Sequence, residues 1–220
     1  MRIIQENSPL PRNKQYIWHH GYLVSFSSRP LSVYRQWFAT PEEAIFRICG
    51  VQEARILLEK DTSFRTFQQE IRDFQWEPLQ EAANTYASQL LLEQIEMVFH
   101  LQRARALNDN IALMDMTLEL FSASTDAMAV QRGVLVRSGN TYYHQVQQSV
   151  GTGTPWTQYH NQAAGIDPTI VPSIENRSIA ALALYQETVR LLQPYLSAEH
   201  WKTIEPLLST IDKMIRKEAL

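Results

Sequence analysis

The feature that most constrains the fold is a long run from Glu77 to Leu107 that contains no glycine and, after Pro78, no proline. Proline is tolerated in the first turn of a helix, and the Asn108-Asp109-Asn110 segment that follows is typical of a turn. Apolar side chains recur along the run at helical spacing: Leu79, Ala83, Tyr86, Leu90, Leu91, Ile95, Val98 and Leu101. The run therefore predicts one long amphipathic helix.

This helix carries the one cluster of side chains that is suited to chemistry. Four residues, at steps of three, four and three, share one side of it: Glu93, Glu96, His100 and Arg103. The pattern is also typical of a solvated ladder of charged side chains, in which each pair stabilises the helix by only about 0.3 kcal/mol. The residues by themselves leave both interpretations open.

Composition narrows the class of protein. The 20 basic and 23 acidic residues give a net charge of −3, so no global field favours nucleic acid or an anionic membrane. The single cysteine, Cys49, rules out an internal disulfide and lies in an apolar run, which favours a buried and inert thiol. No apolar stretch approaches the length of a membrane span, and the N-terminus lacks the apolar core of a signal peptide. We therefore expect a cytoplasmic protein.

Residues 1–62 predict a small α+β portion. The expected elements are a β-hairpin from 14–18 and 22–27 with Gly21 at positive φ, a helix from Pro41 to Gly50, and a buried strand over 54–60. The run LSVYRQWF is ambiguous between strand and helix. His19 and His20 at the hairpin tip are interpreted as solvated turn residues, so no metal site is predicted.

Residues 63–220 predict an antiparallel helical bundle, so the fold class is mainly α. Expected helices cover 64–74, 77–107, 111–136, 141–150, 154–164, 173–192 and 198–217. Thr154, Ser173 and Ser197 are the expected N-caps, and Gly165 the expected C-terminal stop. Pro206 is expected to kink or divide the last helix. A methionine and aromatic stripe in the third long helix is expected to pack in the core: Met114, Leu118, Phe121, Thr125 and Met128.

Over residues 16–165, several segments resemble bacterial nucleotidyltransferases of the aminoglycoside and lincosamide resistance type, in the DNA polymerase beta superfamily. GYLVSFSS resembles the closing hairpin of the catalytic domain, and ARILLEKDTSF its final strand and exit. LLEQIEMVFHLQRARALNDN is similar to the bundle helix that carries a functional glutamate, and LFSASTDAMAVQRGVLVRSGNTYYHQV to the next helix and its turn. The resemblance implies the end of a catalytic domain followed by a helical substrate-binding domain.

The resemblance also implies roles for individual residues. Glu96 best matches the glutamate that acts as general base, taking the proton from a substrate hydroxyl as its oxygen attacks the α-phosphate of a nucleotide. Glu93 takes this place if the alignment is shifted by one turn. The remaining residues implied on the substrate side are His100, Arg103, Asp115, Arg132 and His144.

One part of the family pattern is missing. Relatives carry a Gly-Ser pair and an Asp-x-Asp motif that hold Mg²⁺ and the nucleotide phosphates, and neither occurs in this sequence. Ser25 and Ser27 stand where relatives often have a third carboxylate, and the chain starts too late to contain the missing sheet. We therefore expect no cofactor on this chain alone, with Mg²⁺ and a nucleoside triphosphate only if a separate catalytic chain supplies that half. The chain is expected to be a substrate-binding domain for a small hydroxyl-bearing molecule, or a non-catalytic remnant.

Two other classes of protein remain open. Arg137 and His144 fit, at the loosest allowed spacing, the signature of a HEPN-type RNase that acts as a dimer, although the Ser138-Gly139-Asn140 segment between them is typical of a turn. The five Trp and nine Tyr residues also suit a structural or interaction protein. A homodimer is compatible with each of these classes.

Overall fold

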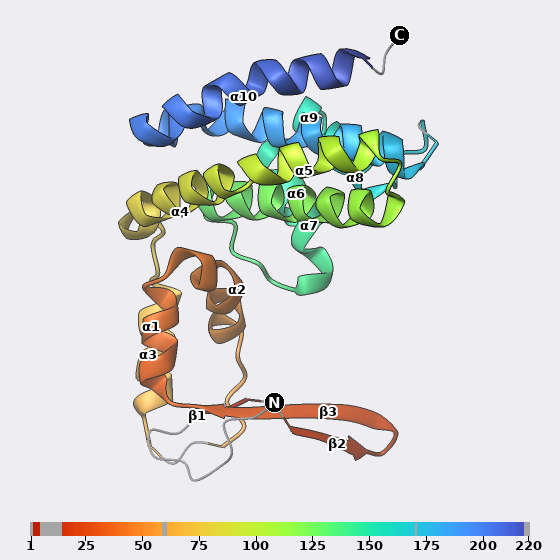
Figure 1. Ribbon diagram of the computed structural model, residues 1–220. Helices are drawn as coiled ribbons and strands as arrows, with labels where there is room; N and C mark the ends of the chain where they lie inside the picture. Colours follow the sequence, from red (N-terminus) through yellow and green to blue (C-terminus); the bar gives the residue numbers. More distant parts are fainter. Residues whose placement is uncertain (1, 5–14, 59–60, 170, 218–220) are drawn as a thin grey trace. The chain divides into compact units, whose positions relative to one another are not determined.

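The computed structural model describes residues 2–4, 15–58, 61–169 and 171–217 of the chain (Figure 1). The fold is mainly helical with a small β-hairpin, which confirms the predicted fold class. The chain forms two compact units: unit 1 comprises Met1–Leu79 with Leu135–Arg137, and unit 2 comprises Gln80–Val134 with Ser138–Leu220. The boundary expected between residues 62 and 63 therefore falls inside unit 1, which also includes the helix that follows it.

Unit 1 begins with a three-stranded sheet in the order β1-β3-β2. The predicted hairpin is present as β2 (Gln15–His19) and β3 (Tyr22–Arg29), which pair antiparallel with His19 opposite Tyr22. Both turn residues have positive φ, 48° at His20 and 81° at Gly21, as a two-residue type I′ turn requires. β1 (Arg2–Ile4) pairs parallel with the end of β3.

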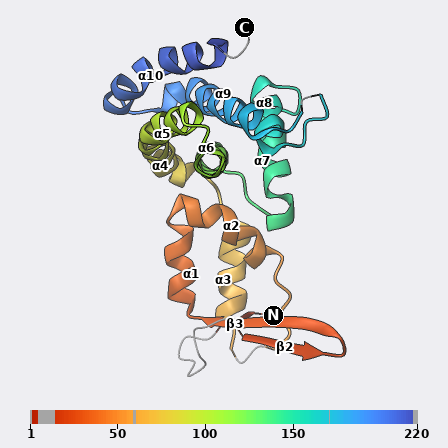
Figure 2. The same ribbon diagram turned by 45° about the vertical axis from the view of Figure 1, so that its right-hand side comes forward.

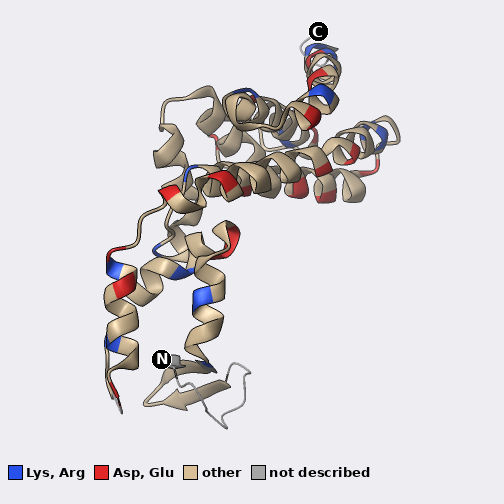
Figure 3. Cartoon of the chain, turned by 90° about the vertical axis from the view of Figure 1, so that its left-hand side faces the viewer, with Lys and Arg blue, Asp and Glu red and all other residues tan. Residues whose placement is uncertain are grey.

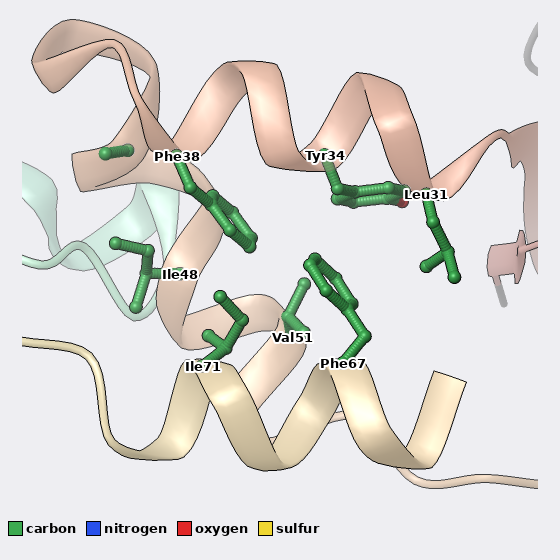
Figure 4. Close-up of a cluster of buried hydrophobic side chains, with 8 residues drawn as sticks. Leu31, Tyr34, Phe38, Ile48, Val51, Phe67 and Ile71 are labelled. Atoms are coloured by element: carbon green, nitrogen blue, oxygen red, sulfur yellow. The ribbon is translucent and has the colours of Figure 1, made fainter. Parts of the chain in front are cut away.

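Three helices enclose the core of unit 1: α1 (Leu31–Phe38), α2 (Pro41–Gln52) and α3 (Ser63–Arg72). The ambiguous run LSVYRQWF is helical because its large apolar residues at positions 31, 34 and 38 then face one side. Figure 4 shows these side chains pointing from α1 towards Phe67 and Ile71 of α3. The rings of Phe38 and Phe67 stack with their centroids 5.6 Å apart.

Two predictions around α2 need correction. The helix does not stop at Gly50 but continues to Gln52. The segment 54–58 is not a strand, and residues 59–60 lie outside the described part of the chain. Leu57 and Leu58, expected to be buried, are 68% and 84% exposed. The reason is a side chain from α3: the Gln68 amide donates to the carbonyl oxygens of Val51 (3.0 Å) and Ala54 (2.7 Å), which secures this segment as a loop.

Cys49 lies on the buried side of α2, as predicted from its apolar neighbours. Burial raises the pKa of its thiol, so the unreactive protonated form is favoured. The predicted burial of this cysteine is confirmed.

Unit 2 is a bundle of helices (Figure 2). Its helices are α4 (Gln80–Glu93), α5 (Ile95–Ala106), α6 (Asn110–Gln131), α7 (Tyr142–Val150), α8 (Pro155–Ala164), α9 (Ile174–Leu192) and α10 (Ala198–Lys217). The amide of Gln80 donates to the carbonyl oxygen of Gln131 (2.8 Å), so the start of α4 lies beside the end of α6 and the two run antiparallel. α6 and α9 pack on each other and supply most of the buried residues.

The caps predicted in unit 2 are present. The Thr154 side chain accepts a bond from the Thr157 amide (3.3 Å), and Gly165 ends α8 in the left-handed conformation with φ 76°. Ser173 and Ser197 cap α9 and α10 in the same way, each at 3.1 Å. Pro206 does not divide α10, which is a single helix through that position.

The predicted core stripe along α6 is only half correct. Phe121, Thr125 and Met128 are buried as expected. Met114 and Leu118, nearer the start of the helix, are 46% and 47% exposed. The spacing correctly identified one face of the helix, but the packed neighbours cover that face only along its second half.

The long helix predicted over 77–107 is interrupted. A 3₁₀ turn (Glu77–Leu79) precedes α4, and Gln94 separates α4 from α5 in a turn. In a continuous helix the carbonyl oxygen of Leu91 accepts from the amide of Ile95. Here the buried hydroxyl of Tyr185 in α9 donates to that oxygen (2.9 Å), and burial raises the pKa of this hydroxyl, which keeps its proton. A side chain inserted into the helical hydrogen-bond ladder is a recognised cause of such a break.

Tyr185→Phe tests this explanation because it removes only the hydroxyl. We expect the free energy of unfolding to fall by about 1 kcal/mol, the usual contribution of one hydrogen bond. Hydrogen exchange of the Ile95 amide is expected to slow, since the Leu91 carbonyl again becomes its acceptor. Tyr195→Phe, at a site 48% exposed, is the matched control and should change neither quantity. Unchanged exchange at Ile95 in Tyr185→Phe would contradict the proposed cause of the break.

Candidate functional site

All seven side chains predicted as site residues are exposed residues of unit 2. They are distributed over its surface as follows: Glu93 at the end of α4, Glu96, His100 and Arg103 on α5, Asp115 on α6, Arg132 just after α6 and His144 on α7. Within the described part of the chain, no hydrogen bond or ion pair joins any two of them. The structure therefore gathers only the three α5 residues, which share one exposed side of that helix by their spacing.

The break at Gln94 separates Glu93 from this group. Glu93 ends α4 and accepts a hydrogen bond from Gln89 one turn earlier (2.9 Å). Glu96 lies beyond the turn, in the first turn of α5, where a carboxylate favourably meets the positive end of the helix dipole. The two glutamates are thus not successive members of one helical ladder.

Arg132 and His144 already have contacts within unit 2. The guanidinium of Arg132 donates to the carbonyl oxygen of Ser149 in the last turn of α7 (2.6 Å) and to the sulfur of Met128 (3.2 Å). A cation at the C-terminal end of a helix is favourable, so Arg132 holds α7 to the end of α6. His144 Nε2 lies 3.0 Å from the Gln148 amide nitrogen, one turn along α7.

The two residues of the HEPN alternative do not share a helix. Arg137 belongs to unit 1, and His144 lies on α7 in unit 2. The segment between them forms the predicted turn, a short 3₁₀ helix (Gly139–Thr141) in which the Ser138 hydroxyl accepts from the Asn140 amide (3.3 Å).

A cluster that the sequence did not predict lies between α6, α7 and α8. The hydroxyl of Tyr142 donates to Oδ1 of Asp126, which joins α7 to α6. The neighbouring Tyr143 ring lies 5.2 Å from that of Tyr142 and is 48% exposed. Behind them the imidazole of His160, on α8, is only 1% exposed. It is surrounded by aromatic rings, with centroids at 4.5 Å for Phe121, 5.0 Å for Trp156 and 5.6 Å for Tyr143.

Burial dominates the electrostatics of this cluster. It raises the pKa of the Asp126 carboxyl, although the hydrogen bond from Tyr142 acts in the opposite direction. The pKa of Tyr142 is raised by burial and by the adjacent carboxylate, so its hydroxyl remains a donor. Burial also lowers the pKa of His160 to about 4, which makes the imidazole neutral near pH 7.

The hydrogen bonds of Gln147 fix the tautomer of His160. The Gln147 amide nitrogen donates to Asn161 Oδ1 (2.7 Å) and lies 2.9 Å from His160 Nδ1. Nδ1 is therefore an acceptor, and the imidazole proton is on Nε2. Nε2 is buried and has no hydrogen-bond partner within the described part of the chain.

The carboxylate of Asp126 is the hydrogen-bond acceptor that this cluster offers. Asp126 is half-buried rather than enclosed, and Tyr142 orients one of its carboxylate oxygens. A carboxylate accepts strong hydrogen bonds from hydroxyl donors. The ring of Tyr143, which neighbours that of Tyr142, is partly exposed.

One signal in the sequence pointed to Asp126. It is the only charged residue in the otherwise small and apolar run SASTDAMAV, on a helix that is buried on most sides. A lone acid in such a run needs a partner, because an unpaired buried charge is costly. Its partner Tyr142 and the nearby His160 lie on later helices, and no sequence pattern connects them.

Neither a candidate metal site nor a candidate membrane span occurs among the described residues. They contain no group of three or more His, Cys, Asp or Glu side chains placed to hold a metal ion. No described helix is long and apolar enough to span a membrane.

No protein-family model matches the sequence, and no curated protein matches it. Among solved structures, a nucleotidyltransferase-like protein from Exiguobacterium sibiricum 255-15 is similar, with 14% sequence identity and a TM-score of 0.47. The match covers 99% of this chain and 78% of that chain. At this identity and TM-score, the likeness gives no information on activity, substrate or site residues.

Proposed function

We propose that this chain is a nucleotidyltransferase-like protein whose helical unit 2 binds a small hydroxyl-bearing molecule. The family part of the proposal rests on the sequence resemblance over residues 16–165. The binding part rests on one observation: the half-buried carboxylate of Asp126 accepts a hydrogen bond from the hydroxyl of Tyr142, whose ring neighbours the partly exposed ring of Tyr143.

In the proposed complex, Asp126 accepts a hydrogen bond from a ligand hydroxyl while Tyr142 holds the other side of the carboxylate. Burial strengthens this bond, because water competes less well for a half-buried carboxylate. Tyr143 covers the apolar face of the ligand. His160 lies behind, neutral and buried, and supports the ring of Tyr143 rather than contacting the ligand.

Glu96 has a separate role in the proposal. The resemblance assigns it the proton-accepting role, with His100 and Arg103 beside it on α5. That role needs a nucleotide and Mg²⁺, and the residues of this chain do not fit such a site: the sequence has no Asp-x-Asp motif, and no acidic or histidine triplet gathers among the described residues. We therefore propose no transfer step for this chain alone, and assign Mg²⁺ and the nucleotide to a separate catalytic chain.

The test is calorimetric titration with aminoglycosides, a lincosamide and simple sugars, each with and without Mg²⁺ and a nucleoside triphosphate. Asp126→Asn keeps the shape of the side chain but loses its charge. Loss of a charge-assisted hydrogen bond costs about 1.5–3 kcal/mol, so we expect affinity to fall about 10- to 100-fold. Tyr143→Ala should also weaken binding. Glu119→Gln is the matched control, since it removes an exposed acid from the same helix and should leave affinity unchanged.

Two outcomes would overturn the proposal that the binding site lies at Asp126. One is binding that Asp126→Asn leaves intact and Glu96→Gln abolishes, which would move the site to α5. The other is the absence of binding to every compound in the panel. Thermal unfolding of each variant in the absence of ligand separates loss of binding from loss of folding.

A further inference from the structure

The turn end of the hairpin in unit 1 exposes large apolar side chains on both of its faces. Four of them are about half to three-quarters exposed: Ile17 (49%), Trp18 (75%), Tyr22 (76%) and Leu23 (55%). Cross-strand partners share a face, so Trp18 and Leu23 lie on one side, whereas Ile17 lies on the other with Val24. In Figures 1 and 2 this end of the hairpin extends beyond the helices of unit 1.

Exposed apolar residues on both faces of one strand pair restrict what can cover it, since such residues are typical of strands that are covered on both sides. A protein partner would have to enclose the hairpin and be complementary in shape to each face. The interfacial layer of a lipid bilayer surrounds an inserted element on every side and adapts to its shape. Tryptophan and tyrosine are enriched in this layer, because their rings are apolar and their N–H or O–H groups reach polar partners. The residues of the hairpin end therefore favour a bilayer.

The length of the apolar hairpin end matches the depth of the interfacial layer. Residues 17–19 of β2 extend about 10 Å at about 3.3 Å per residue. Elements that lie on a membrane enter the boundary between headgroups and acyl chains by about 5–10 Å. The exposed end of the hairpin is therefore long enough to reach this boundary.

Polar groups of the hairpin limit how deeply it can enter. His19 and His20 stand at the turn, with ring centroids 4.2 Å apart, and β2 is the outer strand of the order β1-β3-β2 among the described strands. Imidazoles and the peptide groups of an outer edge need hydrogen-bond partners, which headgroups and their water supply and the hydrocarbon core does not. The hairpin therefore suits the interfacial layer and no deeper one.

The charge around the hairpin favours an anionic bilayer. Residues 7–34 contain three basic residues, Arg12, Lys14 and Arg29, and no acidic one. These cations flank the hairpin, and Figure 3 shows the hairpin itself in tan along nearly all its length. Anionic headgroups attract cations over about 10 Å, so the flanking charges act without entering the membrane. The net charge of −3 is that of the whole chain, whereas this segment carries an excess of positive charge.

A nucleic acid fits this surface less well than a bilayer does. Proteins that bind single strands combine stacking aromatic rings with a positively charged groove that follows the backbone. Residues 15–28 contain no Lys or Arg, and aliphatic Ile17 and Leu23 are exposed beside the aromatic rings. Aliphatic side chains gain free energy in lipid but offer no ring on which a base can stack.

We propose that the turn end of this hairpin, residues 17–23, inserts into the interfacial layer of an anionic lipid bilayer. Trp18 and Leu23 enter on one face of the hairpin and Ile17 on the other, so the surrounding lipid covers both faces. The flanking basic residues are attracted to the headgroups. The attachment is reversible, because one hairpin buries far less apolar surface than a membrane-spanning segment does.

The test is co-sedimentation of the full chain with vesicles of phosphatidylcholine, and with vesicles of equal parts phosphatidylcholine and phosphatidylserine. We expect binding to the anionic vesicles to be at least about 10-fold stronger, since each nearby cation adds about five-fold. Trp18→Ala combined with Tyr22→Ala should lower the affinity for anionic vesicles at least about 10-fold, because much of the inserted apolar area is lost. The matched control combines Leu107→Ala with Ile111→Ala, two apolar residues of unit 2 that are 66% and 79% exposed, and should bind like the wild type.

A fluorescent label reports insertion at the hairpin itself. Tyr22→Cys adds a thiol at a side chain that is 76% exposed, and the native Cys49 is buried, so an environment-sensitive dye attaches at position 22. We expect its emission to shift to shorter wavelength when anionic vesicles are added. The same dye on the Ile111→Cys variant should not respond. Because the labelled side chain is exposed, the reading comes from a folded protein.

Each of four results would overturn the proposal. The first is the absence of binding to anionic vesicles, and the second is equal binding to neutral and anionic vesicles. The third is binding that the variant Trp18→Ala with Tyr22→Ala leaves unchanged, which would place the membrane contact elsewhere. The fourth is a dye at position 22 that responds to single-stranded RNA and not to vesicles, which would assign the hairpin to nucleic acid.

Discussion

Acidification from about pH 7 to about pH 4 is expected to lower the free energy of unfolding by about 3 kcal/mol through His160 alone. The imidazole is buried between aromatic rings, and its pKa is lowered from 6.5 to about 4 in the native protein. The unfolded chain therefore binds this proton at a higher pH than the folded chain does.

The sign follows from proton linkage. Above the unfolded pKa of 6.5 the residue is neutral in both states and contributes no pH dependence. Between 6.5 and about 4 the unfolded state is protonated and the native state is not, so stability falls as the pH falls. Asp126 acts in the opposite direction in acid, because burial raises its pKa and favours the protonated native form. The pH dependence of stability measured for the wild-type protein alone would therefore be the sum of the effects of His160 and Asp126.

Urea unfolding of matched variants isolates the histidine. His160→Gln removes the titrating group, and its pH dependence should be flatter than that of the wild type by about 3 kcal/mol over this range. His144→Gln removes an exposed histidine of the same unit and should reproduce the wild-type profile. Equal slopes for the wild type and His160→Gln would show that the imidazole is not held neutral in the native state.

Trp156→Ala is expected to lower the free energy of unfolding by about 3–5 kcal/mol, the range for truncating a large buried aromatic. The indole is fully buried, stacks on His160, and donates from Nε1 to the Thr188 hydroxyl on α9 (2.8 Å). The substitution leaves a cavity between α8 and α9 and removes this hydrogen bond. Because α8 packs along α9, the substitution weakens the contact between these two helices.

Urea unfolding also measures this loss of stability. One further variant isolates the hydrogen bond, and another is a control at an exposed site. Thr188→Val removes the acceptor but keeps the volume, so it should cost about 1 kcal/mol. Ile111→Ala truncates an apolar residue of α6 that is 79% exposed, and should stay within about 0.5 kcal/mol of the wild type. A loss below about 1 kcal/mol in Trp156→Ala would contradict the packing of the indole in this core.

The sequence by itself determined the features that depend on near neighbours. Thr154 and Gly165 bound α8 as predicted because each acts on backbone groups within a few residues of itself. Ser173 and Ser197 begin their helices for the same reason. The hairpin followed from apolar strands on both sides of a turn at Gly21, a residue that adopts positive φ without strain.

The tertiary structure decided what depends on residues far apart in the chain. No residue within the run 77–107 signals a break at Gln94, since the hydroxyl that accounts for it belongs to Tyr185, 94 positions from its acceptor Leu91. The segment 54–58 had the composition of a strand, and a glutamine of α3 holds it as a loop instead.

In the candidate site, too, the sequence determined one part and the tertiary structure decided the other. The sequence located exposed polar residues on α5 by their spacing, and they do lie together on that helix. It could not bring Asp126, Tyr142 and His160 together, because their proximity results from the packing of α6, α7 and α8. Helical spacing reports which residues share a face of one helix, and only the packed bundle decides which of those faces meet and which side chains are buried between them.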